Sequence, residues 1–301
     1  MHRHVPSRGA RWRACLLLAC ACTFPACVVV SQDVAPPAPD ALARLWQAER
    51  LPLPAPPLVT HAIVETQVAR IARESGGLIK SEVLGTSVEG RAIHHLTVGR
   101  GATPVLLWSQ MHGDEPTATS ALFDLCQWLV RHRQEPVVAR LLDSLTLHIV
   151  PMLNPDGAER FQRRNAQGID INRDALLLQT PEGRLLKALR DRVEPVIGFN
   201  LHNQNWRTSV GKPAQPAAIS LLAVAYDEAR SVDARRQLTK RTCSVIVEAL
   251  QPFAANRIGR YDDEFEVRAF GDNVTKWGTS VVLIETGPYG GPDPDLSLIH
   301  I

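Results

Sequence analysis

The chain has 301 residues, of which 45% are hydrophobic, and its formal net charge is +2. This length and composition allow one sizeable buried core, in one large domain or two small ones, and they exclude disorder as the default state. Four of the 33 basic residues lie in the first thirty positions, so the rest of the chain carries 29 basic against 31 acidic side chains. A near-neutral body without a basic stripe lacks the electrostatic footprint of a nucleic-acid-binding protein.

The first thirty residues have the pattern of a bacterial export signal. Four arginines precede an apolar stretch over residues 14–30. This stretch contains Pro25 and is shorter than the roughly 20 residues that a membrane-spanning helix needs, so a signal is favoured over a transmembrane anchor. Cys20 and Cys27 each follow residues that loosely resemble a lipoprotein signal box, which leaves lipid anchoring open. We therefore expect an exported protein that is periplasmic, secreted or lipid-anchored.

Residues 31–58 separate this signal from the expected folded domain. They contain seven prolines, which is typical of a semi-rigid linker. We expect the domain to begin near Val59 and to extend to residue 295. The last six residues, 296–301, read like the translation of a sequencing adapter, so we expect them to be a non-native tail.

Apolar strand-like runs alternate with helix-like segments after Val59. In chain order, the expected strands cover residues 92–98, 104–109, 145–150, 196–201, 219–225 and 280–284, and the expected helices cover 63–75, 116–133, 181–193 and 233–250. Strands separated by helices predict an α/β domain with a mixed, mostly buried β-sheet that is flanked by helices on both faces. Ligands of such open sheets bind beyond the carboxyl ends of the strands, so polar residues at those ends are the candidates for a site.

Four of the expected strands are followed directly by polar residues that can ligate or transfer protons: His112 with Glu115, residues 154–157, His202 and Glu285. A histidine and a glutamate three residues apart at a strand-to-helix turn can reach one centre, and His202 could supply a third ligand. Two imidazoles and one carboxylate with an open fourth position form a catalytic zinc site of the hydrolytic type. If the turn is considered alone, the alternative to a metal site is a polar turn at the start of a helix, where acidic residues and a proline are favoured.

The ordered motifs of the chain resemble those of the zinc carboxypeptidase family related to pancreatic carboxypeptidase A. The matching stretches are GTSVEGR at 85–91, HGDE at 112–115, NPDG at 154–157, RRN at 163–165, GIDINR at 168–173, LH at 201–202 and IETG at 284–287. The resemblance implies the mixed α/β fold of that family, which normally closes with a helix after the last strand. Because residues 296–301 read as non-native, the domain is expected to be truncated at its C-terminus.

The resemblance also implies a catalytic centre. His112, Glu115 and His202 would bind one zinc ion. Glu285 would be the general base that takes a proton from the attacking water, whose pKa zinc brings toward ~7. Arg163 would face the substrate carbonyl oxygen and stabilise the charge that develops on it.

Further residues are implied in substrate binding. Asn172 and Arg173 would bind the terminal carboxylate of the substrate, a bidentate task suited to a guanidinium group. Asp170 would hold a ligating imidazole in the right tautomer, and we assign that imidazole to His112. Arg91 would line an outer subsite. Tyr261 is the candidate for the family's mobile tyrosine that caps the bound carboxylate, although the residues around it do not match the family pattern.

These residues predict a zinc-dependent carboxypeptidase whose partner is a peptide with a free C-terminal carboxylate. Two alternatives stay open at this point: an N-acyl amino acid deacylase of the aspartoacylase and succinylglutamate desuccinylase type, and a binding module without turnover. Asn200 stands where many family members have an aspartate. Residues 243–278, which would form the specificity pocket, cannot be aligned, so ordinary peptides and murein stem peptides remain equally open as substrates.

Overall fold

A computed structural model describes residue 48 and residues 59–288 of the chain. The predicted export signal, the C-terminal tail at 296–301 and all but one residue of the proline-rich linker lie outside the described residues, as do residues 289–295. Among the residues that are described, no helix combines the length and the apolar character needed to cross a bilayer.

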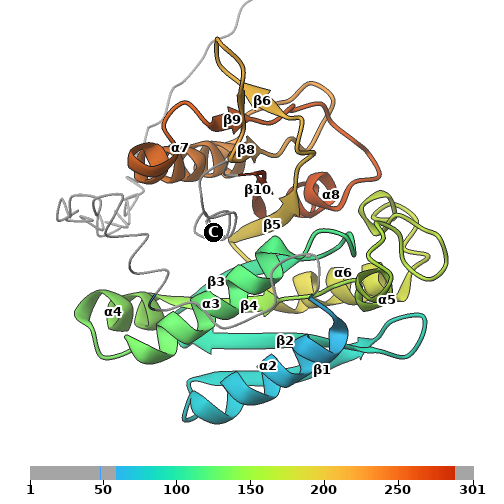
Figure 1. The fold of residues 1–301 in the computed structure, drawn as a ribbon, viewed down its shortest axis with the longest axis vertical. Coiled ribbons are helices and arrows are strands. Elements are labelled where there is room, and N and C mark those ends of the chain that lie inside the picture. Colours follow the sequence, from blue (N-terminus) through green and yellow to red (C-terminus); the bar gives the residue numbers. More distant parts are fainter. Residues whose placement is uncertain (1–47, 49–58, 289–301) are drawn as a thin grey trace, which may run out of the picture. The chain divides into compact units, whose positions relative to one another are not determined.

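One mixed sheet of eight strands carries the fold (Figure 1). Its strand order is β1 (Ile79–Thr86), β2 (Ala92–Gly99), β4 (Leu145–Val150), β3 (Thr103–Ser109), β5 (Ile197–Asn203), β10 (Ser280–Thr286), β8 (Ile219–Ala223) and β9 (Ile258–Arg260). The four central strands, β4, β3, β5 and β10, run parallel. β1, β2 and β8 are antiparallel to inner neighbours, and β9 runs parallel to β8. A separate antiparallel ribbon joins β6 (Ser209–Val210) to β7 (Gln215–Pro216).

Helices cover both faces of the sheet. One core contains buried side chains of α2 (His61–Glu74), α3 (Thr117–Arg131), α4 (Pro136–Ser144) and α7 (Ala234–Ala254). The other contains side chains of α6 (Pro181–Val193) and α8 (Phe270–Lys276). Along β3, Val105 and Leu107 enter the first core while Leu106 and Trp108 enter the second, because successive side chains of a strand point to opposite faces. Two short elements, α5 (Pro155–Glu159) and the 3-10 turn η1 (Ile171–Arg173), lie in the connections.

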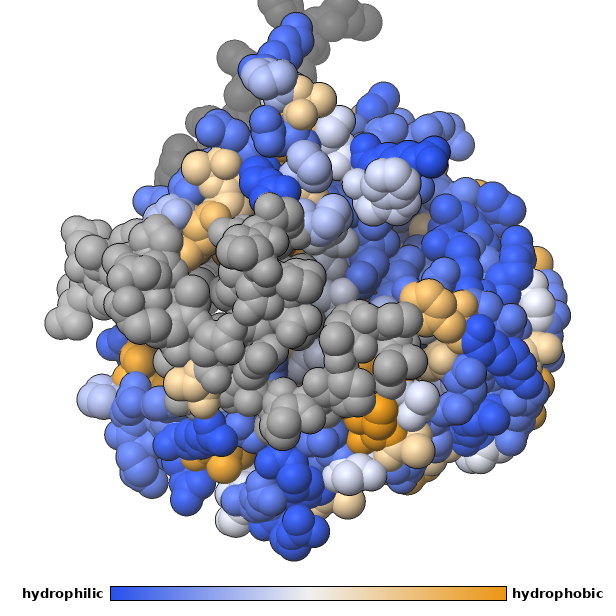
Figure 2. Space-filling view, viewed as in Figure 1, coloured by the Kyte–Doolittle hydropathy of each residue, from blue (hydrophilic) through white to orange (hydrophobic). Residues whose placement is uncertain are grey.

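The sequence prediction of the fold is confirmed. All six expected strands and all four expected helices are present, with ends that differ by a few residues. β1, β6, β7, β9, α4, α5, α8 and η1 were not predicted. On the face that Figure 2 shows, the described surface is mostly hydrophilic and its hydrophobic side chains lie in small separate groups, as is normal for a surface in contact with water.

The GTSVEGR stretch forms the turn between β1 and β2 and binds a buried carboxylate. Asp156, which is fully buried, accepts hydrogen bonds from Ser87 Oγ (2.7 Å) and the Glu89 backbone N–H (3.0 Å), and Arg91 Nη1 lies 2.6 Å from its Oδ1. Gly90 has φ +81°, a left-handed conformation that glycine adopts without a steric penalty. This turn therefore fixes the loop that contains Asp156 to the edge of the sheet.

We predict that Asp156→Ala lowers the free energy of unfolding by about 1–3 kcal/mol, because it leaves the Ser87 hydroxyl and the Glu89 N–H without their acceptor and removes one counter-charge of Arg91. Denaturant unfolding would measure the loss. Asp143→Asn is the matched control, since Asp143 pairs with Arg100 on an exposed surface and its loss should change stability little. Equal effects of the two substitutions would contradict the role given to Asp156.

Candidate metal centre

The turn after β3 is fixed from several sides. β3 ends at Ser109, and Gln110 follows with φ +47°. The Gln110 side chain donates to the Gly113 carbonyl oxygen (3.0 Å) and accepts from Thr119 Oγ1 (2.6 Å), while its own carbonyl oxygen accepts from the Asn154 N–H (3.0 Å). These hydrogen bonds to Gly113, Thr119 and Asn154 fix a sharp turn of the chain. The turn places residues 112–115 beyond the end of the sheet.

This turn lies directly against the NPDG loop. A Cβ atom at Gly113 would be 2.0 Å from the carbonyl carbon of Gly157, so no residue with a side chain fits at this position. Asn154 supports the same contact, because its side chain caps the N–H of Gly157 (2.9 Å) and donates to the Met111 carbonyl oxygen (3.2 Å). Two separate motifs of the sequence thus meet backbone to backbone.

The three predicted ligands converge on one point. His112 Nδ1 lies 2.8 Å from Glu115 Oε1, and His202 Nδ1 lies 2.7 Å from Glu115 Oε2. The two Nδ1 atoms are 3.2 Å apart. Leu201 pairs with Ser109, so His202 stands one residue beyond the end of β3 on the neighbouring strand. All three residues are buried.

This arrangement fits a zinc ion. Ligand atoms at 2.0–2.1 Å from a tetrahedral zinc are about 3.3 Å apart, close to the separations between these three side chains. The other ring nitrogen of His112, Nε2, lies 3.2 Å from Asp170 Oδ1, which directs Nδ1 to the centre. His112, Glu115 and His202 are therefore the residues that can hold the ion, as the sequence predicts.

Charges are strongly coupled at this centre. Burial alone would raise the pKa of Glu115, but the charges and hydrogen bonds of His202 and His112 outweigh it and lower the pKa to about 2. Burial lowers the pKa of His202, which favours the neutral form that binds metals. Burial would also raise the pKa of Asp170, but its hydrogen bond to His112 and the charge of Arg163 hold it below its ordinary value.

Glu285 stands next to this cluster on β10. It pairs in register with His202 of the parallel strand β5, so both side chains point to the same side of the sheet. Burial, followed by the negative charge of Glu115, raises the pKa of Glu285 to about 8. A carboxyl group of this kind readily exchanges a proton near neutral pH.

Arg163 lies at the rim of the centre. Its Nε donates to Asp170 Oδ2 (2.9 Å), and its Nη1 lies 3.1 Å from His112 Nδ1 and 3.6 Å from Glu115 Oε1. The side chain is 43% exposed, so it can reach a ligand that enters from solvent.

A cleft of about 350 Å³ opens above these residues. Arg173, Asn172 and Tyr261 line it together with His112, Glu115, Arg163 and Glu285. Asn172 Oδ1 accepts from the Phe270 N–H (3.0 Å), and Arg173 Nε lies 3.4 Å from a carboxylate oxygen of Glu266. Burial and the charges of Glu285 and Glu115 raise the pKa of Tyr261. The structure thus brings together every predicted site residue except Asp170, which contacts His112 from behind, and Arg91.

Arg91 does not line this cleft. Its guanidinium group is bound to Asp156 and to Glu89 (2.5 Å) in the β1–β2 turn. The GTSVEGR turn thus holds the NPDG loop through Asp156, and a place for Arg91 in an outer subsite stays a prediction.

Several residues that line the cleft were not predicted. Asn203 and Gln204 follow His202 directly, and the Asn203 N–H donates to Glu115 Oε2 (3.3 Å). Four acids also line the cleft: Asp262, Glu264, Glu266 and Asp272. Asn203 could have been found as the residue next to a ligand, whereas the acids come from a region without a recognisable motif.

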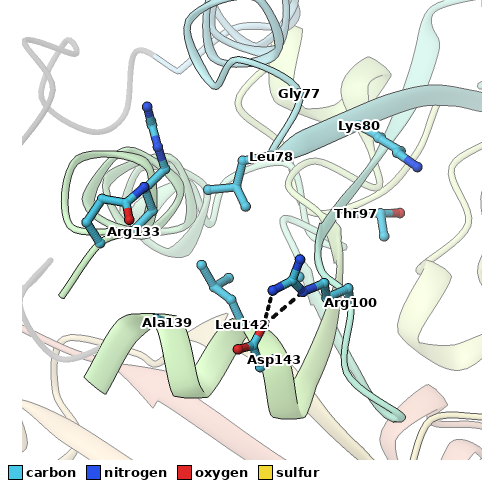
Figure 3. A pocket seen from close by; sticks show the side chains of 11 residues that line it. Gly77, Leu78, Lys80, Thr97, Arg100, Arg133, Ala139, Leu142 and Asp143 are labelled. Carbon is cyan, nitrogen blue, oxygen red and sulfur yellow. Dashed lines mark hydrogen bonds and ion pairs between the residues drawn. The ribbon is translucent and has the colours of Figure 1, made fainter. Parts of the chain in front are cut away.

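A second cavity, of about 490 Å³, lies between β1, β2 and α4 (Figure 3). Its cationic residues are Lys80, Arg100 and Arg133, and Arg100 pairs with Asp143. Histidine, cysteine and glutamate are absent from its lining. The candidate centre therefore belongs to the cleft at the carboxyl ends of the parallel strands.

Comparison with known proteins gives the same family at the levels of sequence and fold. The family model described as zinc carboxypeptidase matches residues 64–216. Mouse carboxypeptidase M is 31% identical over 152 residues, which cover 44% of this chain and 34% of that protein. Carboxypeptidase 2 of Trichophyton rubrum is 28% identical over 149 residues, covering 46% of this chain and 27% of that protein. The chain thus spans about a third of the length of these relatives.

Solved structures show the same fold. The metallo-carboxypeptidase from Burkholderia cenocepacia aligns with a TM-score of 0.63 at 17% identity, over 79% of this chain and 66% of that one. Carboxypeptidase A from Helicoverpa armigera aligns with a TM-score of 0.64 at 15% identity, over 80% and 69% of the two chains. Since the family model covers half of the sequence and the sheet and helices match as well, the chain belongs to the zinc carboxypeptidase family.

Proposed function

We propose that this protein is a zinc-dependent carboxypeptidase that removes the C-terminal residue of a peptide. The observation that carries the proposal is the convergence of His112, Glu115 and His202 at a cleft that Glu285 also lines. The relatives with the matching sequences are named carboxypeptidases, which supports the same activity.

One zinc ion would be held by His112, Glu115 and His202. When bound, it would lower the pKa of a water molecule and polarise the peptide carbonyl. Asp170 would hold His112 with Nδ1 toward the ion, as its contact with Nε2 favours. Neutral His202 and ionised Glu115 are the protonation states that such binding requires.

Glu285 would act as the general base. Its position in register with His202 places the carboxylate next to the ligand set, where it can take a proton from the attacking water and give it to the leaving amine. Arg163, whose Nη1 lies 3.1 Å from His112 Nδ1, would stabilise the negative charge that develops on the carbonyl oxygen.

Asn172 and Arg173 would bind the free carboxylate of the substrate. The Arg173 side chain is 38% exposed and lies near the Glu266 carboxylate, so its guanidinium group is accessible and already contacts a carboxylate. A substrate carboxylate could make charge-assisted hydrogen bonds with the same group. Tyr261 lines the same cleft and would cap the bound carboxylate. Recognition of a terminal carboxylate would restrict the enzyme to chain ends.

The deacylase alternative uses a similar ligand set, and it would act on N-acyl amino acids instead of unblocked peptides. The named relatives favour the peptidase. A binding module without turnover would not need Glu285 beside the ligands. The arginine-rich, apolar N-terminal sequence supports export from the cell, which fractionation of the source cells would test.

We predict that Glu285→Gln lowers kcat for release of single C-terminal residues by about 10²–10⁴-fold, because the general base is lost. Mass spectrometry of a peptide library would measure the products. Zinc content should be retained, since Glu285 is not one of the proposed ligands. Glu248→Gln on α7, outside the cleft, is the matched control and should behave like the wild type. Internal cuts, or an active Glu285→Gln enzyme, would refute the proposal.

A pH prediction follows from the raised pKa of Glu285. In the metal-free protein its folded pKa of about 8 exceeds its ordinary value of 4.5. The protonated carboxyl therefore favours folding, a contribution that is complete below about pH 4.5 and is lost as the pH rises through about 8. We expect chelator-treated Glu285→Gln to lose less thermal stability than the wild type between pH 5 and pH 9. Identical pH profiles of Tm would contradict this expectation.

The charges of the cleft predict a preference for basic C-terminal residues. Four acids line the cleft besides Glu115 and Glu285, against Arg163 and Arg173. Burial raises the pKa of Asp272 to about 6, so this group is ionised above that pH. At pH 7.5 we expect kcat/KM for C-terminal lysine or arginine to exceed that for glutamate by about tenfold, which corresponds to ~1.4 kcal/mol of charge interaction. Asp272→Asn should reduce the ratio, and a preference for acidic residues would refute the prediction.

A further inference from the structure

Helix α2 and strand β2, both labelled in Figure 1, carry a second group of ligating side chains whose ligand atoms converge. His61 is the first residue of α2, and Glu65 lies one turn later on the same side of the helix. His94 belongs to β2. Glu65 Oε1 is 3.1 Å from His61 Nε2 and 2.5 Å from His94 Nε2. One carboxylate oxygen is therefore shared by two imidazoles from different elements.

This α2–β2 cluster, formed by His61, Glu65 and His94, has the composition of the catalytic candidate. Both groups consist of two histidines and one glutamate, and the ligand atoms of each lie within 4.8 Å of one another. The two clusters are separate, because none of these three residues lines the cleft. His94 follows the alternation of β2, in which Leu96 and Val98 enter the core beneath α2. Its neighbour His95 points to the opposite face and contacts Glu82.

The surroundings of the cluster offer a fourth ligand and an entrance. The Ala92 carbonyl oxygen is 2.9 Å from His61 Nε2, so it borders the same space. The Glu65 side chain is 43% exposed, whereas those of His61 and His94 are 16% and 9% exposed. An ion could therefore enter from the carboxylate side and be held by the more buried imidazoles.

Two oxygen atoms lie close to one ring nitrogen of His61. Its Nε2 faces both the Ala92 carbonyl oxygen and the Glu65 carboxylate. A cation at this point would bind the ring lone pair and the oxygen atoms together. Two imidazole nitrogens and a carboxylate suit zinc, whereas calcium and magnesium prefer oxygen ligands.

We propose that His61, Glu65 and His94 form a second zinc site, outside the catalytic cleft, that connects α2 to the sheet. The site would hold the first helix of the described domain onto β2 across the 28 residues that separate Glu65 from His94. An ion that binds only the folded chain stabilises it by mass action, so this site would act on stability and not on the chemistry of the cleft.

The test is the zinc content of four forms of the full chain after dialysis against micromolar free zinc, measured by metal analysis. We expect two ions per chain in the wild type, one in His94→Ala, one in His112→Ala/His202→Ala, and none when all three substitutions are combined. Added zinc should still raise the Tm of the His112→Ala/His202→Ala protein, because the α2–β2 cluster is intact there. It should not raise the Tm of the triple variant.

Two further variants keep the result decisive. Glu65→Gln changes a partly exposed side chain without altering its shape, so it should lower zinc content even where His94→Ala disturbs folding. His95→Ala is the matched control on the opposite face of β2, and it should bind as much zinc as the wild type. Zinc content that Glu65→Gln leaves unchanged, or that falls equally in His95→Ala, would overturn the proposal. Failure of the catalytic assignment would appear separately, as unchanged zinc content in His112→Ala/His202→Ala.

Discussion

The whole centre depends on the contact between two backbones at Gly113 and Gly157. Because Gly113 has no side chain, the turn after β3 can approach the loop after β4 closely, and the carbonyl carbon of Gly157 lies where a Cβ atom of residue 113 would otherwise clash. This contact leaves the side chains of His112 and Glu115 directed toward β5, where His202 completes the group. The buried carboxylate of Asp156 holds the loop from the other side through the β1–β2 turn. Direct contacts thus connect the β1–β2 turn at the edge of the sheet, the NPDG loop and the turn that contains His112 and Glu115.

Electrostatics explains why a divalent cation suits this place. Glu115, Asp170 and Glu285 lie close to two imidazoles and Arg163, and the negative charge of Glu115 contributes to the raised pKa of Glu285. A dication between these carboxylates would remove their mutual repulsion and would allow both to remain ionised. The same reasoning links binding to catalysis, since the charge of the ion would lower the pKa of Glu285, the group that would take up a proton.

The sequence predicted the buried strands, and it pointed to the three side chains that converge at the candidate centre, for a physical reason. Runs such as residues 104–109 and 280–284 are apolar on both faces, which only a covered sheet explains, and the polar residues behind them mark the strand ends. β1 escaped prediction because its pattern is largely exposed and lacks that apolar run. The acids that line the cleft, and the grouping of His61 with His94, come together only when distant segments fold. A local sequence pattern does not contain this information. Arg91 belongs to a recognised motif, and the structure adds an ion pair with Asp156 that the motif alone does not reveal.

The placement of His202 and Glu285 opposite each other on two hydrogen-bonded parallel strands has a consequence for how the candidate centre can diversify. Their separation is determined by the spacing of strands, about 4.8 Å, and not by any surface segment. Insertions or exchanges in the connections around the rim could therefore reshape which residue is accepted while leaving the reacting groups in place. Selectivity and chemistry are in this way assigned to parts of the polypeptide that can vary independently.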